Sequence, residues 1–183
     1  MASKPSPIAA SISPQPVQVE AAGRSFTIPV LPASNWIVAL SGPEPVSEVF
    51  PGLLSSGDFD RILDLMEDGR VDVEDLRKPA FEAVTAASGF RWWEALRLVG
   101  MAEGGPSVIG EMTIRGIDPA DIPFGRWCAA VYVLATRNLE PKERMKWDAK
   151  FSAPPPEAID EEEDSSFEDM IKGFQGMPGA RSG

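Results

Sequence analysis

The feature that most constrains this chain is apolar spacing typical of helices, repeated in short segments that end at glycine or proline. In the clearest segment, "DIPFGRWCAAVYVLATRN", the large apolar side chains fall on one stripe. These expected core residues are Phe124, Trp127, Val131 and Leu134. Asp121 is the expected N-cap of this helix, with Pro123 near its first position. A helix with one apolar face must bury it, so the pattern favours a small helical bundle.

Further segments carry helix start and stop signals. In "GDFDRILDLMEDG", Gly69 is the expected stop. The apolar stripe of this segment comprises Phe59, Ile62, Leu63 and Met66. The segment "VDVEDLRKPAFEAVTAASG" is expected to begin at Asp72 and to end before Gly89, with a kink or break at Pro79. Helices are also predicted in "FRWWEALRLVGMA", in "GPSVIGEMTIRG" and in "EPKERMKWDAKF", where Pro141 takes the first position.

The N-terminal part offers one strand signal and one short helix. Apolar residues alternate in "RSFTIPV", which predicts a short extended segment, and Pro29 limits that segment to an edge. The alternating residues are Phe26, Ile28 and Val30. The next stretch, "LPASNWIVALSG", predicts a short helix with Ser34 or Asn35 as its N-cap.

Composition divides the 183 residues into three parts. Residues 1–23 are rich in Pro, Ser and Ala without apolar periodicity, which predicts a disordered leader. Residues 24–152 are expected to form a mainly α domain, a small bundle of helices with a short extended N-terminal segment. Residues 153–183 are expected to be an acidic flexible tail.

The chain lacks the residues that several kinds of chemistry require. The chain has no histidine, which excludes Ser-His-Asp catalysis and the common zinc sites. Its single cysteine, Cys128, excludes an internal disulfide and is expected to be a small buried hydrophobe. There is no phosphate-binding loop, and the run "DEEED" lacks the ligand pattern of an EF-hand. We therefore expect no enzyme activity, cofactor or metal. No run approaches the ~20 apolar residues of a membrane span.

The net charge of −11 bears on the partner. More than half of it comes from the tail, where eight acidic residues face only Lys172 and Arg181. An acidic chain repels phosphate backbones, so a protein partner is favoured over nucleic acid. Residues 106–127 have the spacing of a helix-turn-helix. The second helix, however, offers only Arg126 and Arg137 to a DNA groove.

Two adjacent tryptophans stand in "GFRWWEALRLVG". Neighbours on a helix point about 100° apart, so Trp92 and Trp93 cannot share one narrow face. Leu96 lies on the same side as both, and the two rings therefore flank one broad apolar stripe. Two interpretations stay open. Either one ring is core and the other half-buried, or one ring is an exposed aromatic anchor for a partner.

A second candidate binding element lies at 166–174 in the tail. Ser165 or Ser166 serves as N-cap for a short helix that ends near Gly173. Its apolar face comprises Phe167, Met170, Ile171 and Phe174. A helix this short is marginal in water and has to bury that face, either on its own domain or on another chain. The acidic spacer before it favours another chain.

Several of these segments together resemble a known family. "FTIPVLPASNWIVAL", "FPGLLSSGD", "RWWEALRLVG" and "IDPADIPFGRWCAAVYVLATRNLEPKERMKWDAKFSAPPPE" resemble the tail assembly chaperones of siphophages that infect actinobacteria. The likeness covers roughly residues 24–157 and is carried mainly by "RWWEALRLV" and the helix that contains Trp127. It rests on the order of segments, because no catalytic signature is involved.

The resemblance implies a non-enzymatic role in virion assembly. Such chaperones act in the host cytoplasm, where they bind the tape measure protein and keep it soluble while tail tube protein subunits polymerise around it. Further chaperone copies are also implied partners, and many members are made in two lengths by translational frameshifting. The alternatives are a structural virion component, such as a tail terminator or head–tail connector, and a small acidic regulatory protein. A connector would assemble into a ring, stay in the particle and contain more strands.

Overall fold

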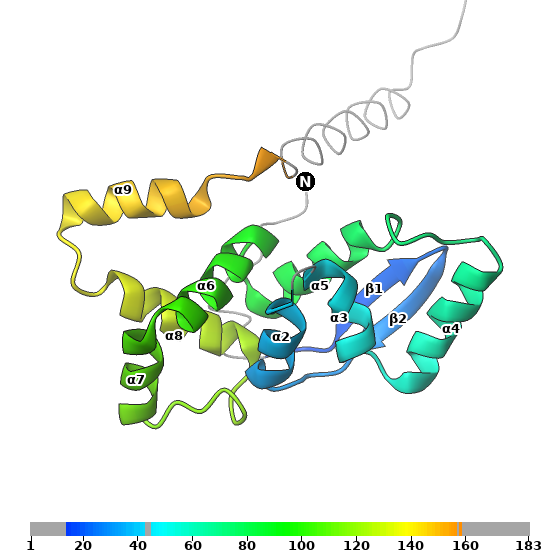
Figure 1. The fold of residues 1–183 in the computed structure, drawn as a ribbon, viewed down its shortest axis with the longest axis horizontal. Helices are drawn as coiled ribbons and strands as arrows, with labels where there is room; N and C mark the ends of the chain where they lie inside the picture. Colours follow the sequence, from blue (N-terminus) through cyan, green and yellow to red (C-terminus); the bar gives the residue numbers. More distant parts are fainter. Residues whose placement is uncertain (1–13, 43–44, 157, 159–183) are drawn as a thin grey trace, which may run out of the picture. The chain divides into compact units, whose positions relative to one another are not determined.

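A computed structural model describes residues 14–42, 45–156 and 158 of the chain. Within these residues lie eight helices and one two-stranded sheet, which confirms a mainly α fold (Figure 1). The elements are β1 (Val17–Ala21), β2 (Arg24–Ile28), α2 (Ala33–Leu40), α3 (Pro45–Leu53), α4 (Ser56–Glu67), α5 (Arg77–Ser88), α6 (Trp92–Gly104), α7 (Pro106–Ile114), α8 (Phe124–Thr136) and α9 (Pro141–Ser152). Two compact units, Met1–Met145 and Lys146–Gly183, divide the chain within α9.

The two strands form an antiparallel hairpin. Val19 pairs with Phe26 and Val17 with Ile28, and all four side chains are buried on the face that meets α5. The two turn residues, Ala22 and Gly23, have φ of 50° and 69°. Positive φ at both positions is typical of the tight turns that match strand twist. The expectation of a disordered leader up to residue 23 is therefore wrong for β1. The extended segment expected at 24–30 is the second strand of a pair.

The core of the first unit is built around α8. The ring of Phe124 stacks on that of Trp36, with centroids 5.3 Å apart, and lies 6.1 Å from the ring of Trp127. Phe124, Trp127 and Val131 are almost fully buried, as the apolar stripe predicted, whereas Leu134 is only partly buried. Because α8 contacts α2, α5, α6 and α7, this stripe joins elements from distant parts of the sequence.

Glycine and proline set the helix ends largely as expected. Gly69 and Gly89 follow the ends of α4 and α5 with φ of 64° and 73°, a left-handed conformation that glycine adopts freely. The helix expected from Asp72, however, begins at Arg77. The Asp72 N–H donates to the carboxylate of Asp75 at 3.0 Å, and the Asp75 N–H donates to the carboxylate of Asp72 at 2.9 Å. These two hydrogen bonds stabilise a separate turn. Pro79 then falls in the first helical turn, where its missing N–H costs nothing.

The predicted N-caps of α2 and α8 are wrong for a tertiary reason. The N-caps are Pro32 and Pro123, whose backbones form an antiparallel bridge. The first amides of α2 find their acceptors in the loop before α8. The Ala33 N–H donates to the carbonyl of Ile122 at 2.8 Å, and the Ser34 N–H donates to the carbonyl of Pro119 at 2.9 Å. With its amides satisfied by a distant backbone, α2 needs no side-chain cap.

Helix α4 is rotated relative to its predicted apolar stripe. Ile62 and Leu65 are its buried residues, whereas Leu63 is 41% exposed. Phe59 and Met66 are partly buried, so the inward face is centred between Ile62 and Leu65. The prediction that Leu63 belongs to the inward stripe is therefore wrong.

Candidate partner-binding surface

The two tryptophans of α6 occupy different environments. Trp93 is 6% exposed and Trp92 is half-buried, in agreement with the interpretation of one core ring and one partly covered ring. Neither is an exposed anchor. The first turn of α6 is fixed by the buried carboxylate of Glu94, which accepts a hydrogen bond of 3.0 Å from the Arg91 N–H.

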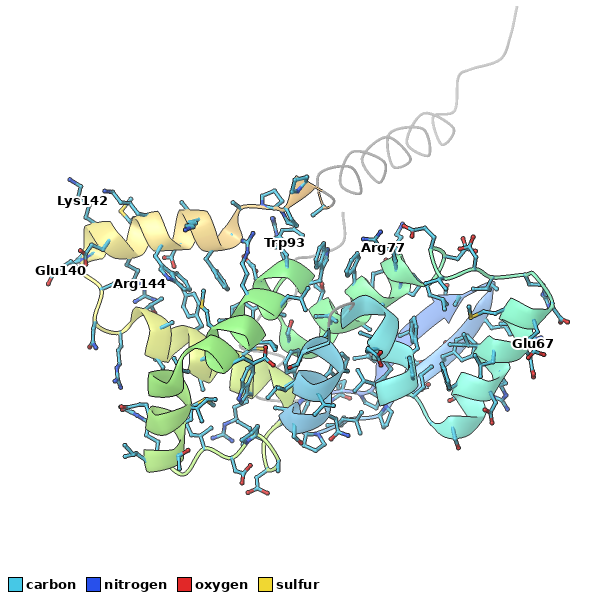
Figure 2. The ribbon with its side chains drawn as sticks, viewed as in Figure 1. Glu67, Arg77, Trp93, Glu140, Lys142 and Arg144 are labelled. Carbon is cyan, nitrogen blue, oxygen red and sulfur yellow. The ribbon has the colours of Figure 1, made fainter. Side chains whose placement is uncertain are left out.

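The tryptophans belong to an aromatic row that sequence analysis did not identify. Phe81 on α5 stacks on Trp92, with ring centroids 3.8 Å apart, and Trp92 meets Trp93 edge to face at 5.5 Å. A guanidinium lies over each outer ring. Arg77 is 5.8 Å from Phe81, and Arg91 is 5.0 Å from Trp93. Arg77 and Trp93, from opposite ends of the row, can be located in Figure 2. The available sequence signal was the spacing of Arg77 and Phe81 by one helical turn.

Beneath this row the helices close tightly. Trp92 lines a narrow apolar crevice that has no room for a water molecule. Its other lining residues are Leu40, Val49, Ala80, Phe81, Val84 and Leu96. Side chains packed this closely belong to the core, so the row stabilises the unit.

An open groove lies instead between α2 and α3, which pack side by side (Figure 1). It has a volume of about 280 Å³, and its floor is Gly52, where an added Cβ would stand 3.3 Å from that of Ala39. Val38 beside it is 77% exposed, and Glu48 contributes the ionisable group of the lining. Ser34 and Asn35 complete the lining. The lining therefore combines the apolar side chains of Val38 and Ala39 with polar ones.

A three-residue ionic network joins α7 to the end of α8. Glu111 accepts hydrogen bonds from Arg137 at 2.6 Å and from Arg115 at 2.9 Å. These two guanidinium groups lower the pKa of Glu111 from 4.5 to about 2, and the hydrogen bond from Arg137 has the largest effect. The same contact raises the pKa of Arg137. All three side chains are solvent-accessible, so the network is a surface clamp between two helices.

This clamp predicts a specific acid response. Since the pKa of Glu111 is depressed in the folded state, its contribution to stability is present above about pH 4.5 and is lost as the pH falls toward about 2. Glu111→Gln should destabilise the protein at neutral pH, and the difference from the unsubstituted chain should shrink across that interval. Urea unfolding at several pH values measures it. A constant difference down to the lowest pH would show that the carboxylate charge is not what the clamp uses.

Cys128 is fully buried, as expected, and burial raises the pKa of its thiol, which keeps it protonated and unreactive. In the part of the chain described by the structure, no three His, Cys, Asp or Glu side chains gather to hold a metal ion. Nor does any helix there have the length and apolar content to cross a membrane. The tail candidates lie outside the described residues; they are Phe167, Met170, Ile171 and Phe174.

Comparison with known proteins gives no relative from which a function can be transferred. The chain matches no protein-family model, no curated protein and no solved structure.

Proposed function

We propose that this protein is a non-enzymatic tail assembly chaperone of a siphophage that infects an actinobacterium. In this proposal it binds the tape measure protein in the host cytoplasm and keeps it soluble while the tail tube assembles. The sequence segments quoted above motivate the proposal. The structure adds a surface on which such a chaperone could act.

The segments that carry the resemblance lie in one compact unit up to residue 145. The loop at 117–123 provides the acceptors for the first amides of α2, and the rings of Trp36 and Phe124 stack across the same junction. Helix α6 packs on both α2 and α8. Segments dispersed over the sequence of the first unit thus pack together. For that part of the chain, this supports treating the resemblance as one domain.

The observation that carries the proposal is the open α2–α3 groove. A tape measure protein is long and helical, and its apolar side chains must be covered before the tube encloses it. An amphipathic helix lays its apolar face into a groove, and this groove offers the exposed Val38 beside polar side chains. The chain's net charge of −11 would keep the complex dispersed.

Co-expression with the cognate tape measure protein tests the proposal. We expect the tape measure protein to become soluble and to co-purify with this chain. Val38→Glu should weaken the complex about tenfold or more without changing the melting temperature, since it places a charge in an apolar contact. Val133→Glu is the matched control, because Val133 is also an exposed helical valine, 57% exposed on α8. A tape measure protein that stays insoluble, with no complex formed, would exclude the proposed function.

The acidic tail gives a second prediction for the same assay. Deleting residues 165–183 should leave the melting temperature unchanged and weaken binding of the tape measure protein or of a second chaperone copy. The reason is the apolar face of Phe167, Met170, Ile171 and Phe174, which a short helix must bury on something. Differential scanning calorimetry and pull-down measure the two effects. A fall of many degrees in melting temperature would mean that the segment packs on its own domain.

A further inference from the structure

We propose that the outer face of α4 in one copy of this protein binds the outer face of α9 in a second copy. The inference rests on the two helices alone, and it holds whether or not the partner is a tape measure protein.

The outer face of α4 is acidic with one large apolar side chain. Its four residues stand at i, i+3, i+4 and i+7 and are all exposed; they are Asp60, Leu63, Asp64 and Glu67. Ile62 and Leu65, on the opposite side of the helix, are the ones that face the core. Glu67 is labelled on this helix in Figure 2. An exposed Leu63 among carboxylates is the side chain that the apolar pattern had wrongly placed inside.

The outer face of α9 has the same spacing with the opposite charge. Its residues at i, i+3, i+4 and i+7 are also all exposed; they are Lys142, Met145, Lys146 and Ala149. The other side of α9 carries the rings of Trp147 and Phe151, stacked with centroids 4.7 Å apart. Lys142 can be seen on this helix in Figure 2.

The two faces match position by position. Asp60 and Asp64 correspond to Lys142 and Lys146, and Leu63 corresponds to Met145, which is 73% exposed. Helix pairs of this kind pack apolar side chains along the seam while flanking charges select the partner. Within the described residues, none of these four charged side chains takes part in an intramolecular ion pair. The charge is therefore available to another molecule.

The geometry determines what such a contact builds. Because two different faces meet, each bound copy still presents one free α4 face or one free α9 face, and association continues head to tail. One pair of short helices buries less than a standard protein interface, so each contact is weak. Under the proposed function, a chain of weakly linked copies would suit the covering of one long partner, because neighbouring copies strengthen each other's binding.

Charge reversal in the full-length protein tests the pairing. Sedimentation velocity should show an average mass above that of the monomer, and this mass should grow with protein concentration. The association constant should fall about tenfold or more between about 25 mM and 0.5 M NaCl. Asp60→Lys with Asp64→Lys should remain monomeric, and so should Lys142→Glu with Lys146→Glu. A 1:1 mixture of the two variants should associate again. The unreversed α9 face of the first variant then meets the unreversed α4 face of the second, and the two reversed faces are again opposite in charge.

Matched controls separate the faces from net charge. Glu82→Lys with Glu103→Lys makes the same charge change on exposed residues of α5 and α6, and it should associate as the unsubstituted chain does. A monomer under all conditions, a mixture that stays monomeric, or controls that abolish association would each overturn the proposal. So would a Leu63→Cys, Met145→Cys chain that a short bismaleimide links within one monomer, since the contact would then be internal.

Discussion

Trp127→Ala is expected to lower the free energy of unfolding by about 3–5 kcal/mol. The Trp127 ring is 3% exposed and lies 6.1 Å from that of Phe124, which in turn stacks on Trp36. Its removal leaves a cavity where α8 meets the rest of the unit. Because Phe124 and Trp36 cannot move without breaking the junction between α2 and the loop before α8, little of that cavity should be refilled.

Urea denaturation followed by circular dichroism measures this loss. Val133→Ala, on the exposed side of the same helix, is the control and should change stability by no more than about 0.5 kcal/mol. A loss below about 1 kcal/mol for Trp127→Ala would mean that the ring is not part of a tightly packed core.

Trp93→Ala should have an effect of similar size, about 3–5 kcal/mol, and Trp92→Ala a smaller one, because Trp92 is only half-buried. Trp93 loses its edge-to-face contact with Trp92 and its contact with the Arg91 guanidinium. The indole N–H of Trp93 is buried and finds no acceptor among the described residues, and such a group costs free energy. Trp93→Phe, which removes that N–H and keeps a ring, should therefore cost less than Trp93→Ala.

The two alanine variants together test how deeply each tryptophan of α6 is buried. Equal losses would place Trp92 as deeply in the core as Trp93. A negligible loss for Trp93→Ala would contradict its burial. Binding of the tape measure protein should be weakened more by Val38→Glu in the α2–α3 groove than by either tryptophan variant, because Trp93 is buried and the half-buried Trp92 stacks on Phe81.

The helix ends and the buried face of α8 could be predicted from the sequence. Gly69 and Gly89 end their helices because glycine adopts positive φ without strain, and Pro141 opens α9 because a first-turn position needs no N–H. The stripe of Phe124, Trp127 and Val131 is buried because a periodic apolar face has one way to leave water. These are properties of a residue and its neighbours within one or two turns.

Of the candidate surfaces, the sequence predicted only the tryptophan pair among the described residues. The α2–α3 groove depends on how closely two helices approach at Gly52, and the aromatic row depends on α5 bringing Phe81 against Trp92. The matching faces of α4 and α9 emerge only once it is known that Leu63 points outward. Each depends on the rotation or spacing of helices, which a single helix does not specify.

By itself, therefore, the sequence determined which segments other than α3 are helical, where most of them end and which face of α8 is buried. Only the tertiary structure decided that the segment 17–21 is a strand, because β1 needs β2 to satisfy its backbone groups. It also decided that the first amides of α2 are capped by carbonyls of the loop before α8. Hydrogen bonds within a helix are set by neighbours in the chain, whereas these contacts join residues whose proximity exists only after the chain has folded.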